Sequence, residues 1–397
     1  MPDPTPRPIY MDYAATTPVD PRVAAAMAEC LGLDGAFGNP ASTGHFFGIE
    51  ARRKVENARG QVAQLIGADP EGIIFTSGAT ESNNLAILGT ARYRRDHGTH
   101  IITAKTEHKA VLDPCRQLEK EGCRVTYLRP DRFGVVAPEQ VAGALSAATV
   151  LVSLMHVNNE IGVVTDIESI GRLCRERGVL LHVDAAQSVG KIAVDVRGWN
   201  VDLLSLTAHK FYGPKGSGAL YVRRRPPLGL VPLMFGGGHE GGLRSGTLPT
   251  HQVVGLGAAC AIALEEMASD ATRIESLRAQ LLAGLESLGG VYCNGHPTQR
   301  IAHLLNVSFE GVEGESLIFG LPGLAVSTGS ACNSATQEPS YVLRALGRSD
   351  ALAQGSIRFS LGRFSSAAEV KEAVCAVRAE VRRLRALSPA TDVRESA

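Results

Sequence analysis

The chain has 397 residues, 44% of them hydrophobic, which suffices for more than one packed core, so we expect a large domain with a smaller one. Its 40 basic residues balance 40 acidic ones and no apolar run reaches the roughly 20 residues that span a bilayer, which argues against nucleic acid and membranes as partners. Eight scattered cysteines without a CxxC pair, and an N-terminus without the apolar segment of a signal peptide, favour a soluble cytoplasmic protein with neither a zinc site nor a disulfide framework.

Between about residues 50 and 222, short strand-like segments alternate with amphipathic, helix-like ones. Helices are expected at 81–95 and 167–178, and strands at 72–76, 100–104, 124–128, 149–155, 179–185, 201–207 and 218–222. Nearly continuous apolar strands separated by helices are typical of a mostly parallel sheet that is covered on both faces. Functional residues are then expected at the carboxyl ends of the strands.

After residue 248 the pattern changes to one that favours a smaller α+β unit. Two long helices are expected here, at about 249–269 and 271–288. The remaining expected elements are strands at 303–309, 324–328 and 356–361 and helices near 313–320 and 366–387.

The segment FTSGATES, residues 75–82, places Thr76, Ser77 and Gly78 between a predicted strand and a helix that begins near Ala79. The free N–H groups and the dipole of a helix N-terminus attract anions, so this turn is a candidate phosphate site. An ordinary Ser/Thr helix cap explains the same residues. The pattern matches neither a P-loop nor G-x-G-x-x-G, which argues against ATP and dinucleotides.

Two further strands deliver polar residues to their ends. His108 lies in TEHKAV, after the strand at 100–104, and Asp184 ends an apolar strand, with Gln187 three residues further on. A carboxylate at the end of a buried strand is costly unless it is paired, so we expect Asp184 to face a cation. A helix-capping role also fits this aspartate.

The segment LTAHKFYGPKGSGALYV, residues 206–222, places His209 and Lys210 where another strand ends. Only eight of the 40 basic residues are lysines, and lysine, unlike arginine, can lose its proton and act as a nucleophile. The glycines that follow let the chain turn away sharply. A solvated surface charge is the alternative for Lys210, and Lys215 is a weaker candidate because no strand fixes it.

Together these residues predict a phosphate cradle, a carboxylate, a histidine and a lysine at one sheet edge, which is the set that pyridoxal phosphate (PLP) requires. The lysine would hold the cofactor covalently and the carboxylate would keep its ring nitrogen protonated. Cys332 lies in a polar segment, STGSACNSATQEPS at 327–340, without the apolar neighbours that usually bury a cysteine. It is therefore a candidate for an accessible nucleophile.

Motifs along almost the whole chain resemble those of cysteine desulfurases of the NifS/IscS type, PLP enzymes of aminotransferase class V. These motifs are YMDYAATTPVD (10–20), GNPAS (38–42), FTSGATES, TEHKAV, MHVNNEIG (155–162), HVDAAQSVGK, HKFYGPKG, GGGHEGGLRSGT (236–247), GSACNS, EPSYVLRALG and SIRFSLGRF (356–364). The resemblance implies the α/β fold of PLP-dependent transferases (aspartate aminotransferase fold type I). Residues 16–255 would form a large domain with a mostly parallel seven-stranded sheet, and 1–15 and 256–397 a small α+β domain that carries the cysteine segment.

The resemblance also implies the catalytic roles. Lys210 would bind the cofactor covalently and move protons on the substrate, and His108 would stack on the cofactor ring. Cys332 would attack the sulfur of L-cysteine, retain it as a persulfide and release L-alanine. Asn159 and Arg358 would orient the substrate.

The remaining implied roles concern the cofactor. Asp184 would pair with the ring nitrogen and Gln187 would bond the ring hydroxyl. Thr247 would reach the phosphate of the neighbouring subunit, so a homodimer with shared sites is implied. The full set of implied cofactor-binding residues is Ala79, Thr80, Asn159, Asp184, Gln187, Thr207, His209, Lys210 and Thr247.

The implied partners are L-cysteine, a second copy of the chain, and an iron–sulfur scaffold or another sulfur-acceptor protein. No resident metal is expected, although Cys332 could contact a nascent iron–sulfur cluster as cargo. The alternatives are a selenocysteine lyase or other class V PLP enzyme, and a sulfur or metal carrier without enzymatic activity. Cys332 argues against a transaminase, which needs no thiol, and the lysine–aspartate–phosphate set argues against a carrier. Which acceptor receives the sulfur stays open, because the chain ends at SPATDVRESA, short of the tail that docks a scaffold in some members.

Overall fold

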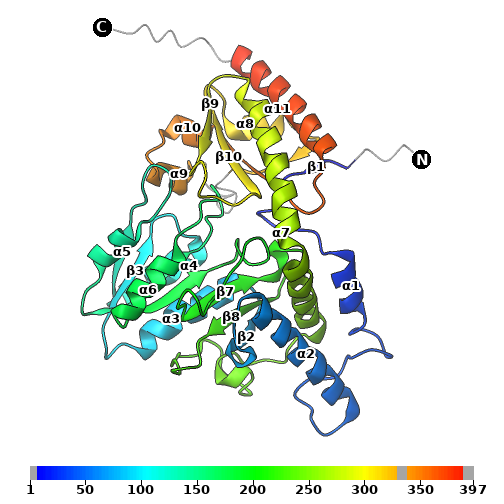
Figure 1. The fold of residues 1–397 in the computed structure, drawn as a ribbon, viewed down its shortest axis with the longest axis vertical. Coiled ribbons are helices and arrows are strands. Elements are labelled where there is room, and N and C mark those ends of the chain that lie inside the picture. Colours follow the sequence, from blue (N-terminus) through cyan, green and yellow to red (C-terminus); the bar gives the residue numbers. More distant parts are fainter. Residues whose placement is uncertain (1–6, 329–337, 388–397) are drawn as a thin grey trace.

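The computed structural model describes residues 7–328 and 338–387, and its larger sheet has seven strands (Figure 1). Their order is β2-β8-β7-β6-β5-β3-β4, and all neighbours are parallel except β8, which runs antiparallel to β2 and β7. The predicted α/β fold with a mostly parallel seven-stranded sheet is confirmed. The strands are β2 (Ile73–Thr76), β3 (His100–Ala104), β4 (Arg124–Leu128), β5 (Thr149–Met155), β6 (Leu180–Asp184), β7 (Leu203–Thr207) and β8 (Gly218–Val222).

Helices cover both faces of this sheet because its strands carry apolar side chains on both sides. Ile73 and Phe75 of β2 pack into one core, and Ile74 between them packs into the other, as the alternation of a strand requires. The first core includes α2 (Phe46–Leu65), α5 (Pro138–Ala144) and α6 (Ile167–Glu176), and the second includes α3 (Ala79–Tyr93) and α4 (Lys109–Lys120). Short 3-10 turns lie at Pro70–Gly72, Ala208–Lys210 and Glu240–Gly242.

The C-terminal part of the chain forms a smaller three-stranded antiparallel sheet in the order β12-β10-β9. Its apolar side chains pack with α8, α11 and the second half of α7 into a separate core. A short parallel pair, β1 (Ile9–Tyr10) with β11 (Leu324–Ala325), brings the N-terminal segment to this unit. The elements are β9 (Val291–Asn294), β10 (Leu304–Phe309), α8 (Gly314–Phe319), α9 (Tyr341–Ala345), α10 (Asp350–Gln354), β12 (Ser356–Ser360) and α11 (Ala367–Leu387).

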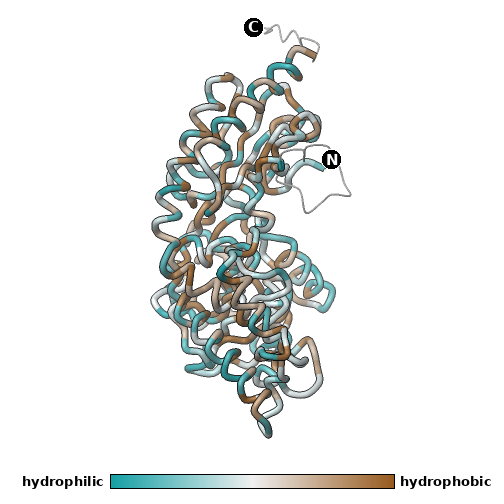
Figure 2. The backbone as a smooth tube through the Cα atoms, turned by 90° about the vertical axis from the view of Figure 1, so that its right-hand side faces the viewer, coloured by the Kyte–Doolittle hydropathy of each residue, from teal (hydrophilic) through white to brown (hydrophobic). Residues whose placement is uncertain are grey.

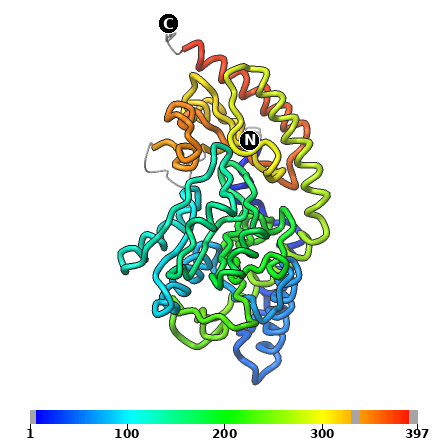
Figure 3. Tube along the Cα trace, turned by 60° about the vertical axis from the view of Figure 1, so that its left-hand side comes forward, coloured from blue at the N-terminus to red at the C-terminus, as the bar shows by residue number. Residues whose placement is uncertain are grey.

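One helix, α7 (Thr250–Glu286), joins the two cores, and it runs along one side of the molecule (Figure 3). Val253 and Leu256 pack in the core beneath the large sheet, whereas Ile274 and Leu277 pack in the core of the small one. The two helices expected at 249–269 and 271–288 are therefore wrong, because α7 is continuous. At the expected break, the Asp270 carboxylate accepts hydrogen bonds from Arg273 and Arg363.

α7 is also the one helix in the described ranges that is long and apolar enough, by composition, to cross a membrane. Its contacts with α1 (Pro21–Ala28), α2 and α11 make it a core helix of this fold. The side view shows the elongated outline that results, with both ends of the described chain in the half that holds the small sheet (Figure 2).

Candidate active site

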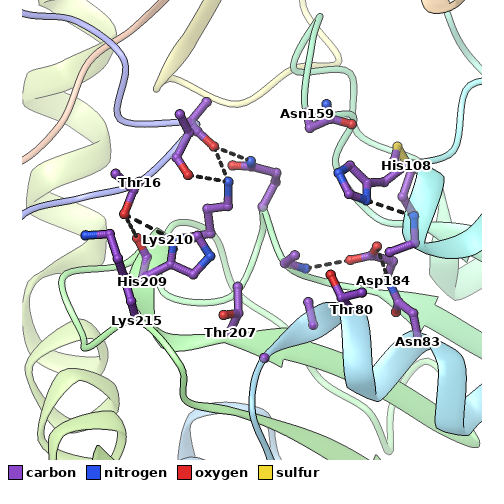
Figure 4. Close-up of a pocket in the computed structure, with 18 of the residues that line it drawn as sticks. Thr16, Thr80, Asn83, His108, Asn159, Asp184, Thr207, His209, Lys210 and Lys215 are labelled. Atoms are coloured by element: carbon purple, nitrogen blue, oxygen red, sulfur yellow. Dashed lines mark hydrogen bonds between the residues drawn. The ribbon is translucent and has the colours of Figure 1, made fainter. Parts of the chain in front are cut away.

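The carboxyl ends of the parallel strands open into one cavity of about 570 Å³ (Figure 4). Asp184 ends β6, Thr207 ends β7, and the turn at Ser77–Gly78 follows β2. Strand ends meet at this edge because the strands are parallel, as expected from the sequence. Of the predicted site residues, the lining includes Ala79, Thr80, His108, Asn159, Asp184, Gln187, Thr207, His209, Lys210 and Arg358.

The Lys210 side chain is held in the cavity by the N-terminal segment. Its Nζ donates to the backbone oxygens of Ala14 at 2.5 Å and Ala15 at 2.7 Å (Figure 4). The chain turns immediately afterwards, and a Cβ on Gly213 would lie 2.7 Å from the Cβ of Ala208. A glycine is therefore required for the sharp turn that leaves Lys210 at the strand end.

His209, the neighbour of Lys210, is a neutral imidazole. Burial, and then the positive charges of Lys210 and Lys215, lower its pKa to about 4. Its Nδ1 lies 3.1 Å from the hydroxyl of Thr16, so the ring is fixed against the same N-terminal segment (Figure 4).

Asp184 lies 5% exposed at the end of β6 and holds its carboxylate between two donors. The side chain of Asn83 donates to Oδ2 at 2.7 Å, and the backbone N–H of Ala186 donates to Oδ1 at 2.9 Å. The helix-capping role considered for Asp184 is wrong, because turns and no helix follow β6. Its carboxylate instead fixes the turn after β6 and lines the cavity.

His108 caps α4, and its Nδ1 accepts the backbone N–H of Ala110 at 3.1 Å (Figure 4). A ring nitrogen that accepts a hydrogen bond carries no proton, so the imidazole proton belongs on Nε2. The first turn of α4 therefore fixes both the orientation and the tautomer of the His108 ring.

The N-terminus of α3 forms one wall of the cavity. Its cap residue is Gly78, at φ 146° and without a side-chain cap, so the ordinary Ser/Thr cap considered for this segment is wrong. The Glu81 carboxylate accepts a hydrogen bond from the N–H of Ser77 at 2.7 Å. The N–H groups of Ala79 and Thr80 lie in the first turn of α3, where no intrahelical acceptor exists for them. The helix end thus offers donors to an anion in the cavity.

Arg358 of β12 and Asn159 lie on the small-sheet side of the cavity. The guanidinium donates to the backbone oxygen of Asn159 at 2.9 Å and to the carboxylate of Asp12 at 2.8 Å. Nε of Arg358 and Oδ1 of Asn159 are buried without a hydrogen-bond partner in the described part of the chain. Both side chains thus retain polar atoms for a further ligand.

Of the predicted residues that the structure describes, Thr247 does not line this cavity. Thr247 is exposed on the segment before α7. Cys332 lies outside the described residues. No group of three or more histidine, cysteine, aspartate or glutamate side chains suited to a metal occurs within 7–328 and 338–387.

Several residues of the site were not singled out from the sequence. Asn83 lies one turn inside α3, where its segment resembles an ordinary amphipathic helix. Ala14 and Ala15 act through backbone oxygens, which no side-chain pattern reveals. Lys191 donates to Gln187 from a buried position, and the scarcity of lysine in the chain was the one signal that pointed to it.

Comparisons with known proteins agree with this geometry. The family model described as aminotransferase class V matches residues 9–373. The "Cysteine desulfurase IscS" of Aeromonas hydrophila is 62% identical over 382 residues, covering 96% of this chain and 95% of the relative. Among solved structures, a "NifS-like protein" superposes with a TM-score of 0.89 at 37% identity, covering 95% of this chain and 100% of the other. "SspA in complex with cysteine" gives 0.80 at 40% identity, covering 90% and 100%.

Proposed function

The chain belongs to the class V aminotransferase family, and from that premise we propose that it is a PLP-dependent cysteine desulfurase. It converts L-cysteine to L-alanine and retains the sulfur as a persulfide. The observation that carries this proposal is the meeting of Lys210, Asp184 and the N-terminus of α3 in one cavity.

The cavity residues fit the cofactor. A volume of about 570 Å³ lies within the range of small-molecule sites. Lys210 supplies the amine for the aldehyde, Asp184 the carboxylate for the ring nitrogen, and the first N–H groups of α3 the donors for the phosphate. Gly78 has a φ of 146°, which favours glycine at the entry to this helix.

When bound, PLP supplies an electron sink for the pair of electrons released at the substrate α-carbon. The residues around it manage charge and protons. Asp184, held by Asn83, is the carboxylate that would pair with the protonated ring nitrogen. Lys210, once released from the cofactor, is the base that takes the α-proton and returns it.

Arg358 and Asn159 bind the substrate carboxylate in this proposal. A guanidinium matches a carboxylate with parallel donors, and its Nε has no hydrogen-bond partner among the described residues. The ion pair with Asp12 orients the guanidinium before substrate arrives.

The sulfur step is carried by Cys332, as the thiolate. Its sulfur forms a bond to the substrate sulfur while the substrate Cβ–S bond breaks, and the electron pair of that bond stays with the carbon. Protonation of the carbon gives the methyl group of alanine, and the enzyme retains the persulfide. Transfer of that sulfur to an acceptor protein regenerates the thiol.

The proposal includes a homodimer in which Thr247 reaches the phosphate site of the second copy. It also places the enzyme in the cytoplasm, with an iron–sulfur scaffold or another sulfur-acceptor protein as its partner. The acceptor takes sulfur from Cys332, and a nascent cluster would meet this residue only as cargo.

The test compares wild type with Cys332→Ala, both loaded with PLP and incubated with L-cysteine without oxygen. Both proteins should bind the cofactor and change its absorbance when cysteine is added, because these steps need the cavity alone. Wild type should form alanine and a persulfide on the peptide that contains residues 327–340, read by mass spectrometry. The variant should lose the persulfide and fall at least ~100-fold in alanine release, since the nucleophile is gone. Undiminished alanine release with a persulfide elsewhere would contradict the assignment.

A further inference from the structure

A buried lysine lies behind the wall of the cavity and has no assigned role. Lys191 is 5% exposed, and its Nζ donates to Oε1 of Gln187 at 2.7 Å. No carboxylate forms an ion pair with it anywhere in 7–328 or 338–387, and its charged neighbours, Lys210 and Arg358, are cations. Burial and those two charges lower the pKa of Lys191 to about 7. A lysine kept in such surroundings calls for a reason beyond packing.

The contacts of Lys191 determine which way the Gln187 amide faces. The backbone oxygen of Ala14 can only accept, so Nε2 of Gln187 must be the atom that lies 2.8 Å from it. Oε1 then faces Lys191, whose Nζ has N–H groups to donate to it in either protonation state. Both partners favour this orientation of the amide. The reversed one would set two oxygens against each other at Ala14 and would take the acceptor away from Lys191.

The same contacts connect Lys191 to Lys210. The backbone oxygen of Ala14 accepts one hydrogen bond from Nε2 of Gln187 and another, at 2.5 Å, from Nζ of Lys210. Gln187 also lines the cavity, and its amide nitrogen carries a second hydrogen beyond the one given to Ala14. The fixed orientation therefore presents a donor to the cavity and turns the amide oxygen away from it.

We propose that Lys191 is a positioning residue of the cofactor site, which acts by holding Gln187 so that its N–H faces the ring hydroxyl oxygen of PLP. This rests on the proposed function, because Gln187 is assigned to that hydroxyl. A flipped amide would withdraw this N–H donor from the cofactor oxygen. Lys191 does not touch the cofactor, and its influence passes through one side chain.

Lys191→Met, of similar length and without a donor, is the first test. PLP binding to the apoprotein is measured by equilibrium dialysis, and the absorbance of the bound cofactor is recorded between pH 6 and 9. We expect the dissociation constant to rise roughly tenfold and the pH midpoint of the absorbance change to shift, since one oriented hydrogen bond is lost. A purely packing role would alter thermal unfolding without moving the absorbance.

A double-mutant cycle with Gln187→Ala decides whether the effect passes through Gln187. If it does, Lys191→Met should have no further effect on binding or absorbance once Gln187 is alanine. Effects that multiply in the double variant, or a Lys191→Met protein with wild-type binding and absorbance, would overturn the proposal. Wild-type apoprotein that binds no PLP would contradict the proposed function instead.

Lys191→Gln keeps a hydrogen-bond donor and covers the case in which the methionine variant does not fold. It should bind PLP within about threefold of wild type, because its amide can still donate to Oε1 while the Ala14 oxygen favours the same orientation of Gln187. A loss as large as that of Gln187→Ala would show that orientation is not what Lys191 provides.

Discussion

Two lysines line the cavity, and their surroundings differ at the scale of single residues. Lys210 ends the short 3-10 turn after β7 and is held by the oxygens of Ala14 and Ala15. Lys215 lies past Pro214 with an exposed side chain. Covalent attachment of the cofactor needs an amine in a fixed place, and of these two lysines only Lys210 has its amine fixed in this way.

We therefore expect Lys210→Ala to lose covalent cofactor and to fall at least ~100-fold in alanine release, since the base is also lost. Lys215→Ala, the matched control from the same cavity, should keep both. Borohydride reduction of the loaded proteins followed by peptide mapping locates the label. A label on Lys215 in wild type, or equal losses in the two variants, would reverse the assignment.

Residues that end recognisable strands could be predicted from the sequence, because strand ends converge whatever the details of packing. His108, Asp184 and Lys210 are of this kind, and the structure brings them to one cavity. Asn83 and Lys191 could not be predicted, since their importance depends on which side chain lies opposite them. Asn83 contacts Asp184, which lies about 100 residues away in the sequence. Lys191 contacts Gln187, only four residues away, but this stretch forms turns and no helix that the sequence pattern would reveal.

At the scale of elements, α7 is where the sequence misleads. The sequence predicts a break between helices near residue 270, but α7 continues through it, and Asp270 pairs with Arg363 from a segment 93 residues away. A partner so distant in the sequence leaves no local signal, so the tertiary contact could not be seen in the sequence of the helix itself. The strands, by contrast, were recognisable from short apolar runs that need no distant partner.

The continuity of α7 leads to a prediction at Ser269, an exposed position between the two cores. Ser269→Pro should lower the free energy of unfolding by about 3 kcal/mol, because proline removes an intrahelical bond and clashes with the preceding turn. Ser269→Ala removes only the hydroxyl's bond to Glu266 and should change it by less than ~0.5 kcal/mol. Urea titration followed by circular dichroism measures both, and indistinguishable midpoints would mean that the helix is not continuous in solution.

At the scale of the whole molecule, the N-terminal segment links the parts that form the site. Tyr10 pairs with β11 beside the small sheet, and a few residues later Thr17 receives the N–H of Tyr212 on its hydroxyl at 2.7 Å. The oxygens that hold Lys210 lie between these two contacts. Packing that spans 195 residues of sequence leaves no local pattern, so this half of the cavity could not be predicted.

Six large apolar side chains are exposed around the start of α2. They are Leu31, Leu33, Phe37, Phe46, Phe47 and Ile49, with exposed fractions of 46% to 89%. The rings of Phe37 and Phe47 lie 5.2 Å apart, and those of Phe46 and Phe47 5.7 Å apart, so the patch is contiguous in part. Contiguous exposed apolar surface marks an interaction site, and the proposed homodimer supplies its partner.

Phe46→Asp should therefore convert the dimer to monomer at micromolar concentration, because a carboxylate in an apolar interface loses its hydration without gaining a partner. The expected rise in the dimer dissociation constant is about 100-fold or more, and PLP should bind more weakly, since Thr247 of the second copy would be lost from the phosphate site. Phe319→Asp is the matched control: this phenylalanine is 90% exposed on α8, so the change adds the same charge away from the patch and should leave the dimer intact. Sedimentation equilibrium at several concentrations separates the two variants. A Phe46→Asp protein that remains dimeric, or one that dissociates no more than Phe319→Asp, would move the interface away from α2.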